Sequence, residues 1–403
     1  MGHAQRDKRT ICVVTGSRAD YGHIFSLMEA IRADADLNMQ LVATGMHLEP
    51  QFGLTYRVIE ADGFKIDRKV KILRYGNTDV GVTKAFGLGC QKFAEVFSEL
   101  KPDMVVLIGD RYETFAACVA AYFQRIPIAH IHGGETTQGA FDEGIRHSIS
   151  KMATVHFAAA DAYAQRIIQL GESPKRVFPF GAPGLDTIYR TVPLSREELE
   201  ARLGLKLTAP VAVVTYHPVT LESADSQKQA DELFAALKRF SLTVIFTKAN
   251  ADPQGVRINT AADRFCKQNP KRYKLFDNLG QRMYYSCLKN ADLMIGNSSS
   301  GLLEAPVFHL PAVNIGDRQK NRIRSANVID VDCRAEAIAK GIRRALSAGF
   351  RRSLKKLINP YDRTSGRVGE RIKNQLKRLS LHEGVIKKTF FDLPVKVGGN
   401  GRP

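Results

Sequence analysis

The 403-residue sequence has few cysteines and no long apolar segment. Its six cysteines are scattered, and none of them forms a CxxC pair or the spacing of a zinc site. We therefore expect reduced thiols in the core. No N-terminal stretch resembles a signal peptide, and no run of about 18 apolar residues reaches the length of a membrane span. These absences predict a cytoplasmic protein that has no membrane partner.

Positive charge is abundant, and most of it lies toward the C-terminus. The formal net charge is +18, and residues 318–403 hold 22 Lys and Arg against 7 Asp and Glu. Because basic patches bind phosphate backbones, a polyanion-binding protein is the candidate from a different functional class. The basic residues of this segment recur at helical spacing without interleaved aromatic side chains, which is typical of a solvated helix face. We therefore expect no nucleic-acid partner.

Short apolar strands alternate with helix-like segments along most of the chain. In the first half, strand candidates such as 104–108 and 155–158 are separated from each other by a helical pattern such as 112–124. The alternation restarts at a strand over 211–215. Uninterrupted apolar strands alternating with helices predict parallel sheets covered on both faces. The expected fold class is therefore α/β, with two Rossmann-like doubly wound domains facing across a cleft.

Domain boundaries follow from the same alternation. We expect an N-terminal domain over residues 1–185, a second domain over 186–362, a C-terminal helix within 363–390 that crosses back to the first domain, and a flexible tail over 391–403. Open α/β sheets bind ligands outside the carboxyl ends of their strands. The loops at these ends are therefore the expected site.

Ionisable side chains crowd three segments that follow strands of the first domain. The segments are Gly109–Glu113, His130–Glu135 and Asp142–His147. Carboxylates and imidazoles gathered at one sheet edge suit proton transfer, because burial and mutual interaction move their pKa values toward neutrality. Two structural interpretations stay open. One is a metal site, which the alternation of the two histidines along a strand argues against, and the second is a set of helix caps and salt bridges.

A second group of polar loops follows strands of the second domain. The segment Gly296–Gly301 places serines between a strand and a helix-like stretch, where backbone N–H groups and hydroxyls suit a diphosphate. It lacks the lysine of a P-loop and the spacing of a dinucleotide fingerprint, so neither ATP nor NAD is an expected cofactor. A simple N-cap turn is the structural alternative. His217, Asn250 and Arg318 follow other strands, and Glu304 is either a ribose contact or a solvated carboxylate.

Together and in this order, the motifs resemble the hydrolysing UDP-N-acetylglucosamine 2-epimerases of the sialic and legionaminic acid type. The motifs are TGSRADY, GDRYE, HIHGGE, DEGIRH, TYHPVT and GNSSSGLLE, followed by Arg318. The resemblance implies two Rossmann-like domains similar to those of glycosyltransferases of the B type. It also implies that no metal and no redox cofactor is needed, and that the chain forms a homodimer or homotetramer.

The reaction implied by the resemblance converts UDP-GlcNAc and water to ManNAc and UDP. Loss of the C2 proton and of UDP gives a 2-acetamidoglucal, water adds at C1, and C2 is reprotonated from the other face. The same reaction on UDP-2,4-diacetamido-2,4,6-trideoxyglucose stays open as the nearest rival. A non-hydrolysing epimerase and a two-domain glycosyltransferase are less favoured.

The resemblance also implies roles for individual residues. Asp110 and Asp142 are the acid and base groups, and Arg146 holds the site together. Several relatives carry Glu at the position of His132, so the third catalytic group is either His132, favoured by position, or Glu135. His217, near the diphosphate, is counted with the catalytic groups as well as with the ligand contacts. The implied contacts to UDP and the substrate are Arg18, Arg111, His217, Asn250, Ser299, Ser300, Gly301, Glu304 and Arg318.

Overall fold

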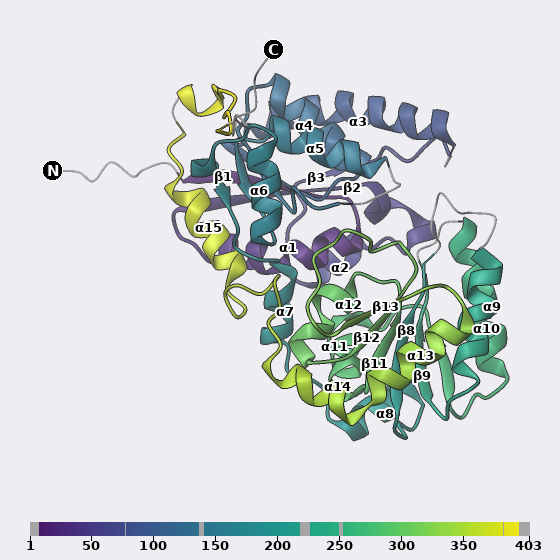
Figure 1. Ribbon diagram of the computed structural model, residues 1–403. Helices are drawn as coiled ribbons and strands as arrows, with labels where there is room; N and C mark the ends of the chain where they lie inside the picture. Colours follow the sequence, from purple (N-terminus) through teal and green to yellow (C-terminus); the bar gives the residue numbers. More distant parts are fainter. Residues whose placement is uncertain are drawn as a thin grey trace, which may run out of the picture. The chain divides into compact units, whose positions relative to one another are not determined.

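The computed structural model describes residues 8–76, 78–136, 141–217, 226–249, 253–381 and 383–394. The chain forms two compact units (Figure 1). Unit 1 comprises residues 1–135, 144–183 and 367–403, and unit 2 comprises residues 136–143 and 184–366. Each unit is built on one parallel sheet, so the expected α/β fold with two Rossmann-like halves is confirmed.

Unit 1 contains a seven-stranded sheet in the order β3-β2-β1-β4-β5-β6-β7, with parallel pairing throughout. The strands are β1 (Arg9–Thr15), β2 (Leu37–Thr44), β3 (Arg68–Val70), β4 (Met104–Ile108), β5 (Ile128–Ile131), β6 (Val155–Phe157) and β7 (Val177–Phe178). The strand order reverses between β1 and β4. In doubly wound folds this switch point is where ligands bind, outside the carboxyl ends of the strands.

Helices cover both faces of the unit 1 sheet. Ile11 and Val13 of β1 pack in one apolar cluster with residues of α1 and α15, whereas Cys12 and Val14 pack in another with residues of α3 and α4. This alternation follows from the two-residue period of a strand. The helices are α1 (Arg18–Arg32), α2 (Tyr56–Ala61), α3 (Asp79–Leu100), α4 (Tyr112–Phe123), α5 (Asp142–Met152), α6 (Asp161–Gln169) and α15 (Val368–Arg378).

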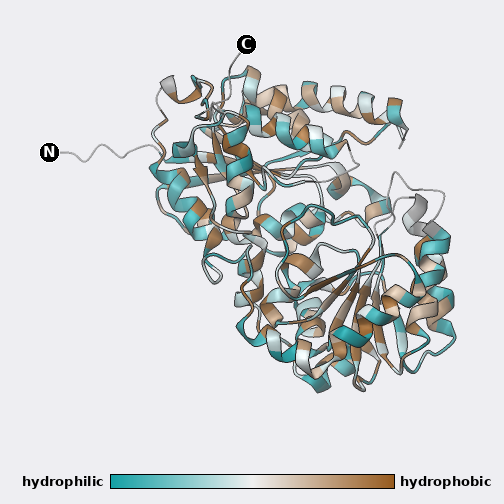
Figure 2. Cartoon of the chain, in the orientation of Figure 1, coloured by the Kyte–Doolittle hydropathy of each residue, from teal (hydrophilic) through white to brown (hydrophobic). Residues whose placement is uncertain are grey.

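Unit 2 repeats the arrangement with a six-stranded sheet in the order β10-β9-β8-β11-β12-β13. The strands are β8 (Val211–Thr215), β9 (Thr243–Thr247), β10 (Tyr273–Phe276), β11 (Leu293–Gly296), β12 (Ala312–Ile315) and β13 (Val328–Val331). All pairs are parallel, and the order reverses between β8 and β11. The strands are strongly hydrophobic, and the exposed faces of the helices are mixed or hydrophilic (Figure 2). The switch point of this sheet therefore lies at the ends of β8 and β11.

The helices of unit 2 lie on both sides of its sheet. They are α7 (Gly184–Arg190), α8 (Arg196–Leu203), α9 (Ser226–Leu237), α10 (Pro253–Lys267), α11 (Gly280–Asn290), α12 (Ser300–Leu303), α13 (Ala335–Leu346) and α14 (Ala348–Ser353). The sequence pattern predicts a helix over 302–307, but α12 ends at Leu303 and a 3-10 turn follows over Ala305–Phe308. Pro306 explains the difference, because it has no N–H to continue the α-helical hydrogen bonds.

The structure also bears on the expectations about cysteines, membrane spans and the C-terminal tail. All six cysteines are free; four are buried and two are half-buried. In the part of the chain that the structure describes, no helix is long and apolar enough to cross a membrane. Most of the expected tail over 391–403 lies outside the described residues. The free thiols agree with the expectation of reduced cysteines.

Candidate active site

In unit 1 the candidate site begins at the switch point, where β1 and β4 end. Ser17 caps α1, because its hydroxyl oxygen accepts a hydrogen bond from the backbone N–H of Asp20 at 3.2 Å. Gly109 follows β4 with φ +76°, a left-handed conformation that glycine adopts without strain. Asp110 and Arg111 come directly after this turn. Charged residues therefore follow both strands at the edge where such sheets bind ligands.

Arg146 joins two loops of this site. It lies on α5 and is 3% exposed. Its Nη2 atom donates to Oδ2 of Asp110, which follows β4, and its Nη1 atom donates at 2.8 Å to the backbone carbonyl of His132, which follows β5. A guanidinium that is hydrogen-bonded to a carboxylate fixes the orientation of both groups. Arg146 therefore sets Asp110 and the turn after β5 in a defined arrangement.

The turn after β5 brings His132 and Glu135 into contact. His132 is 7% exposed and Glu135 is 4% exposed. Nδ1 of His132 lies 2.5 Å from Oε1 of Glu135. His132 has φ +63°, which is strained for a residue with a side chain. At Gly134 a Cβ atom would lie 2.3 Å from the carbonyl oxygen of Tyr163, so only glycine fits there. The close packing of this turn therefore holds the pair in place.

Two more carboxyl groups, those of Asp20 and Glu113, interact with Arg111. Glu113 is fully buried and accepts a hydrogen bond from Nε of Arg111 at 2.5 Å. The negative charge of Glu113 raises the pKa of Arg111 above its usual range. Burial raises the pKa of Asp20 to about 6, and the positive charge of Arg111 offsets this only in part. Unit 1 therefore contains a carboxyl group that titrates close to neutral pH.

In unit 2 the buried side chain of Asn297 links the ends of β8 and β11. Its Oδ1 atom accepts a hydrogen bond from the backbone N–H of His217 at 2.7 Å, and its Nδ2 atom donates to the carbonyl of His217 at 2.8 Å. The carbonyl of Asn297 accepts hydrogen bonds from Arg318 at 3.0 Å and from Gln319 at 2.9 Å. Three loops that the sequence singled out therefore meet at one residue.

His217 is neutral at physiological pH. Burial, followed by the positive charge of Arg318, lowers the pKa of His217 to about 3. A neutral imidazole donates a hydrogen bond from one nitrogen and accepts at the other. His217 therefore offers hydrogen bonds, and the positive charge on this side comes from Arg318.

The serine loop after β11 is shaped by a close backbone approach. Gly296 has φ +135°, and a Cβ atom there would lie 1.9 Å from the carbonyl oxygen of Thr215, so only glycine fits. The Ser300 hydroxyl lies 2.6 Å from the hydroxyl of Tyr284. Burial raises the pKa of Glu304 above its usual range, although a hydrogen bond with Ser300 opposes the effect. Hydroxyl groups and a carboxyl group are thus gathered beside the end of β11.

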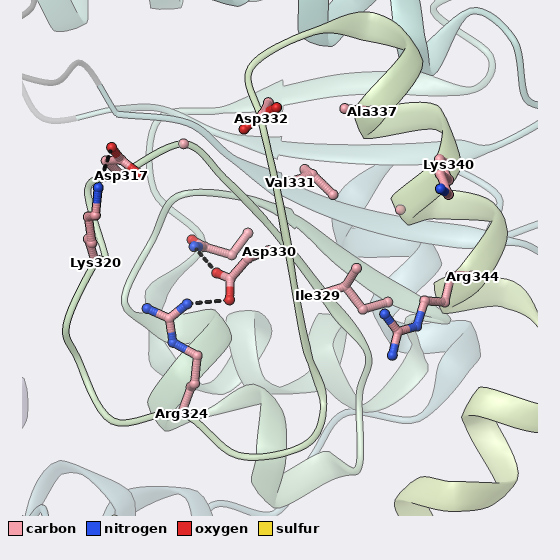
Figure 3. A pocket seen from close by; sticks show the side chains of 13 residues that line it. Asp317, Lys320, Arg324, Ile329, Asp330, Val331, Asp332, Ala337, Lys340 and Arg344 are labelled. Atoms are coloured by element: carbon pink, nitrogen blue, oxygen red, sulfur yellow. Dashed lines mark hydrogen bonds and ion pairs between the residues drawn. The ribbon is translucent and has the colours of Figure 1, made fainter.

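A pocket of about 500 Å³ lies along β12, β13 and α13 of unit 2 (Figure 3). On its wall Arg324 pairs with Asp330, and Lys320 pairs with Asp317 at 3.1 Å. Gly316 and Asp317 line it together with α13 residues, but the described residues of its lining do not include Ser299–Gly301 or Glu304. The predicted diphosphate contacts of the serine loop therefore do not line this pocket.

Comparison with known proteins identifies the family. Residues 29–377 match the family described as UDP-N-acetylglucosamine 2-epimerase. A relative from Campylobacter jejuni, named GDP/UDP-N,N'-diacetylbacillosamine 2-epimerase (hydrolyzing), is 44% identical over 80% of this chain and 84% of its own length. The chain belongs to the hydrolysing UDP-N-acetylglucosamine 2-epimerase family. This enzyme is therefore a hydrolysing UDP-sugar 2-epimerase, and the resemblance seen in the motifs is confirmed.

Two further comparisons agree with this assignment. A relative from Legionella pneumophila, named UDP-N,N'-diacetylbacillosamine 2-epimerase (hydrolyzing), is 36% identical over 94% of the enzyme and 98% of its own length. A solved structure, that of UDP-GlcNAc 2-epimerase from Neisseria meningitidis bound to UDP-GlcNAc, has a TM-score of 0.80 at 16% identity and covers 92% of the enzyme and 100% of that chain. The structural likeness confirms a glycosyltransferase-B-like two-domain fold.

In unit 1 the structure brings together most of the residues that the sequence singled out. Asp110, His132, Glu135 and Arg146 form one hydrogen-bonded group. Arg111 interacts with Glu113, and Arg18 is the first residue of α1. Asp142, the first residue of α5, belongs to the segment that is assigned to unit 2. Among the described residues, no group of three or more His, Cys, Asp and Glu side chains is arranged to hold a metal ion. The roles assigned to these residues stay predictions.

Unit 2 contains a second group of the residues that the sequence singled out. His217 and Arg318 both bond to Asn297. The remaining predicted contacts of this unit follow β11 directly, namely Ser299, Ser300, Gly301 and Glu304. Asn250, a further predicted contact, lies outside the described residues.

Sequence reasoning missed three residues of the site: Asp20, Glu113 and Asn297. Each stands in a motif that the sequence analysis quoted, so a signal was present. The motifs do not show, however, that these side chains are buried or which groups they contact. A Cβ atom at Gly16 or Gly45 would lie within 3 Å of the Glu113 side chain, which shows how closely the backbone surrounds this carboxyl group. Such contacts join segments that are far apart in the sequence.

Proposed function

We propose that the enzyme converts UDP-2,4-diacetamido-2,4,6-trideoxyglucose and water to UDP and the free 2-epimer, 2,4-diacetamido-2,4,6-trideoxymannose. One observation carries the proposal: the relative that is 44% identical over 80% of the chain is named for this sugar, as N,N'-diacetylbacillosamine. The Legionella relative is named for the same sugar. The rival substrate of the sequence analysis thereby becomes the first candidate.

UDP-N-acetylglucosamine, with ManNAc as the product, is the second candidate. The family that matches residues 29–377 carries this substrate in its description. The two nucleotide sugars share the 2-acetamido group and the diphosphate at C1, and they differ at C4 and C6. The same groups on the enzyme therefore serve the chemistry in either case.

The proposed reaction is an elimination followed by an addition. A base takes the C2 proton, the electron pair of the C2–H bond forms the C1=C2 bond, and the bond from C1 to oxygen breaks as UDP leaves. Water then adds its hydroxyl at C1 of the 2-acetamidoglucal, and C2 receives a proton from the opposite face. Because the C2 proton is weakly acidic, stabilisation of the departing diphosphate has to assist the base.

We assign the proton transfers to Asp110, Asp142 and His132. Arg146 supports this assignment, because it bonds to Asp110 and to the turn that carries His132. A proton-transferring group must be held within hydrogen-bond reach of its target, so a buried guanidinium between two such groups serves their positioning. Loss of Arg146 would leave the Asp110 carboxylate without this partner.

We assign UDP binding to the serine loop and its neighbours. Ser299, Ser300 and the backbone of Gly301 bond to the diphosphate, and Glu304 bonds to the ribose. The α12 helix has only four residues. Individual N–H groups and hydroxyls, rather than a long helix dipole, therefore stabilise the leaving group. The other proposed contacts are Arg18, Arg111, His217, Asn250 and Arg318.

A direct assay tests the function. The purified enzyme is incubated in deuterated water with each of the two nucleotide sugars, UDP release is measured by chromatography, and the sugar is identified by NMR. We expect free 2-epimer with deuterium at C2, and a kcat/KM at least about tenfold higher for the diacetamido sugar. Asp110→Asn serves as the inactive control for contaminating activity.

Other outcomes would decide against the proposal. A higher kcat/KM for UDP-GlcNAc would transfer the assignment to the second candidate. A product that retains UDP would identify a non-hydrolysing epimerase.

A further inference from the structure

The two candidates for the third catalytic group are bonded to each other. His132 and Glu135 lie at the two ends of one tight turn, and His132 Nδ1 is 2.5 Å from Oε1 of Glu135. Both residues are more than nine-tenths buried. The other ring nitrogen of His132, Nε2, is also buried and has no hydrogen-bond partner among the described residues. The pair is therefore asymmetric, because Nδ1 is hydrogen-bonded whereas Nε2 is buried without a partner among the described residues.

The bond to Glu135 determines which nitrogen carries the hydrogen. An ionised carboxylate only accepts hydrogen bonds, so Nδ1 of His132 must be the donor. In the neutral imidazole this leaves a lone pair on Nε2. A buried acceptor without a donor destabilises a folded protein, because its hydration is lost and not replaced. Such exceptions call for an explanation, and a catalytic role is one.

A neighbouring histidine shows a different arrangement. His130, two residues earlier on β5, uses both nitrogens: Nε2 bonds to the carbonyl of Gly109 at 2.8 Å, and Nδ1 bonds to the hydroxyl of Ser150 at 3.1 Å. Burial lowers its pKa to about 3, so it remains neutral. Both ring nitrogens of His130 are thus hydrogen-bonded, whereas Nε2 of His132 has no partner in the part of the chain that the structure describes.

The backbone around His132 holds the imidazole in this state. Arg146 donates to the carbonyl of His132 at 2.8 Å, and Arg166 on α6 donates to the carbonyl of Gly134. The left-handed conformation of His132, with φ +63°, is unfavourable and persists only where the surroundings enforce it. The ring of His23 packs against the His132 ring, with 5.4 Å between their centroids. Because Arg146 also bonds to Asp110, it places His132 in the same hydrogen-bonded group as Asp110.

We propose that Glu135 is a positioning residue that acts through His132. It fixes the tautomer with hydrogen on Nδ1, so that Nε2 accepts the proton of the sugar. This inference rests on the proposed function. In the elimination the C2–H bond breaks, its proton binds Nε2, its electron pair forms the C1=C2 bond, and UDP leaves with the electron pair of the C1–O bond. The carboxylate of Glu135 stabilises the resulting imidazolium.

The decisive variant is Glu135→Gln, which keeps the size of the side chain. The amide of Gln can donate to Nδ1, which would move the ring hydrogen to Nε2 and remove the acceptor. We expect kcat to fall by about 10²-fold or more, in line with loss of a general base, while KM changes less than about threefold. The ring ¹⁵N chemical shifts of His132 in the full-length enzyme report the tautomer directly and need no substrate.

A second background makes the test specific. The His132→Glu variant has no imidazole at position 132, so Glu135 has no tautomer to fix. Adding Glu135→Gln to this variant should therefore change kcat by less than about threefold. Such non-additivity is the signature of a residue that acts through its neighbour. A full loss of kcat on adding Glu135→Gln to His132→Glu would overturn the proposal.

The buried pair of His156 and Glu172 supplies a matched control. His156 Nε2 lies 3.1 Å from Oε2 of Glu172, in the same unit but outside the site. Like Nε2 of His132, the second ring nitrogen of His156, Nδ1, is buried and has no hydrogen-bond partner among the described residues. Glu172→Gln should lower thermal stability and leave kcat within about twofold of wild type. If Glu135→Gln lowers kcat no more than Glu172→Gln does, or leaves the His132 tautomer unchanged, the proposal is wrong. If the wild type turns over neither nucleotide sugar, the proposed function fails, while the ¹⁵N spectra still test whether Glu135 sets the tautomer.

Discussion

The negative charge of Asp20 is only partly balanced by its surroundings in the folded protein. Burial has the largest effect on its pKa, and the charges of Glu113 and Asp110 add to it. Its Oδ2 atom is buried and has no hydrogen-bond partner in the described ranges. In the folded protein the carboxyl group therefore keeps its proton up to about pH 6, whereas its ordinary pKa is 3.8.

This difference predicts how Asp20→Asn changes stability with pH. The folded pKa lies above the unfolded pKa, so ionised Asp20 destabilises the enzyme fully above about pH 6 and not at all below about pH 4. A shift of about two units corresponds to at most about 3 kcal/mol. Calorimetry should therefore find a higher unfolding midpoint for the variant at about pH 7.5, and a smaller difference at about pH 4.5. Equal differences at both pH values would contradict titration of Asp20 in this window.

Several residues of the site were readable from the sequence, but the partners of these residues were not. The motifs indicated Asp110, Arg146 and the choice between His132 and Glu135. The bond from Arg146 to Asp110 spans 36 positions, and its geometry depends on the packing of α5 against the sheet. The relation between His132 and Glu135 depends on a left-handed backbone conformation that residue type does not predict for histidine.

Among the elements, α15 completes one face of the unit 1 sheet. Val368, Ile372 and Leu376 are buried in the same apolar cluster as residues of α1 and β1. The two helices approach closely at Gly369, where a Cβ atom would lie 2.7 Å from the backbone nitrogen of Leu27. The absence of a side chain at Gly369 therefore sets the distance between α1 and α15.

Gly369→Ala should destabilise unit 1, although alanine favours helix formation. The added methyl group meets backbone atoms that cannot rotate away, and overpacking of this kind costs about 1–3 kcal/mol. Gly87→Ala in α3 is the matched control, because a Cβ atom there meets nothing within 4 Å. The control should be neutral or stabilising by up to about 1 kcal/mol. Thermal unfolding of both variants checks this, and equal midpoints would mean that α1 and α15 are not in tight contact.

The strands were more predictable than the short elements. Met104–Ile108 and Val211–Thr215 were predicted with the bounds that the structure has, because fully buried parallel strands are uninterrupted apolar runs. The strand Arg68–Val70 was missed, since two of its three residues are charged and exposed at the sheet edge. Edge strands carry a weaker apolar signal because one side is open to solvent.

Considered as a whole, the molecule builds unit 1 from segments at both ends of the chain. Residues 367–403 belong to unit 1, although the chain reaches them only after unit 2. Some of the positive charge of this segment is used inside unit 1. Lys373 and Lys377 pair with Asp34, and Lys388 pairs with the buried carboxylate of Glu172 at 2.7 Å. These pairs favour a structural role for part of the basic segment over polyanion binding.

A truncated chain tests this dependence. A chain that ends at Gly366 lacks the apolar residues of α15, whose burial contributes about 5–9 kcal/mol at about 1.5–3 kcal/mol each. That is comparable to the whole stability of a domain, about 5–15 kcal/mol. Calorimetry should therefore show loss of the unfolding transition of unit 1. A chain that ends at Pro394, which keeps every described residue of the C-terminal segment, is the control. A normal transition in the shorter chain would show that α15 is dispensable.

The sequence by itself determined the family, the α/β class and the positions of the polar loops, because these depend on local pattern and on residue identity near strand ends. Only the tertiary structure decided which loops meet. Asn297 joins strands β8 and β11 across 80 positions. Strand β1 lies beside β4, and the strand order of the sheet reverses at this pair. Such contacts depend on strand pairing and on packing across large sequence separations, which residue type alone does not encode.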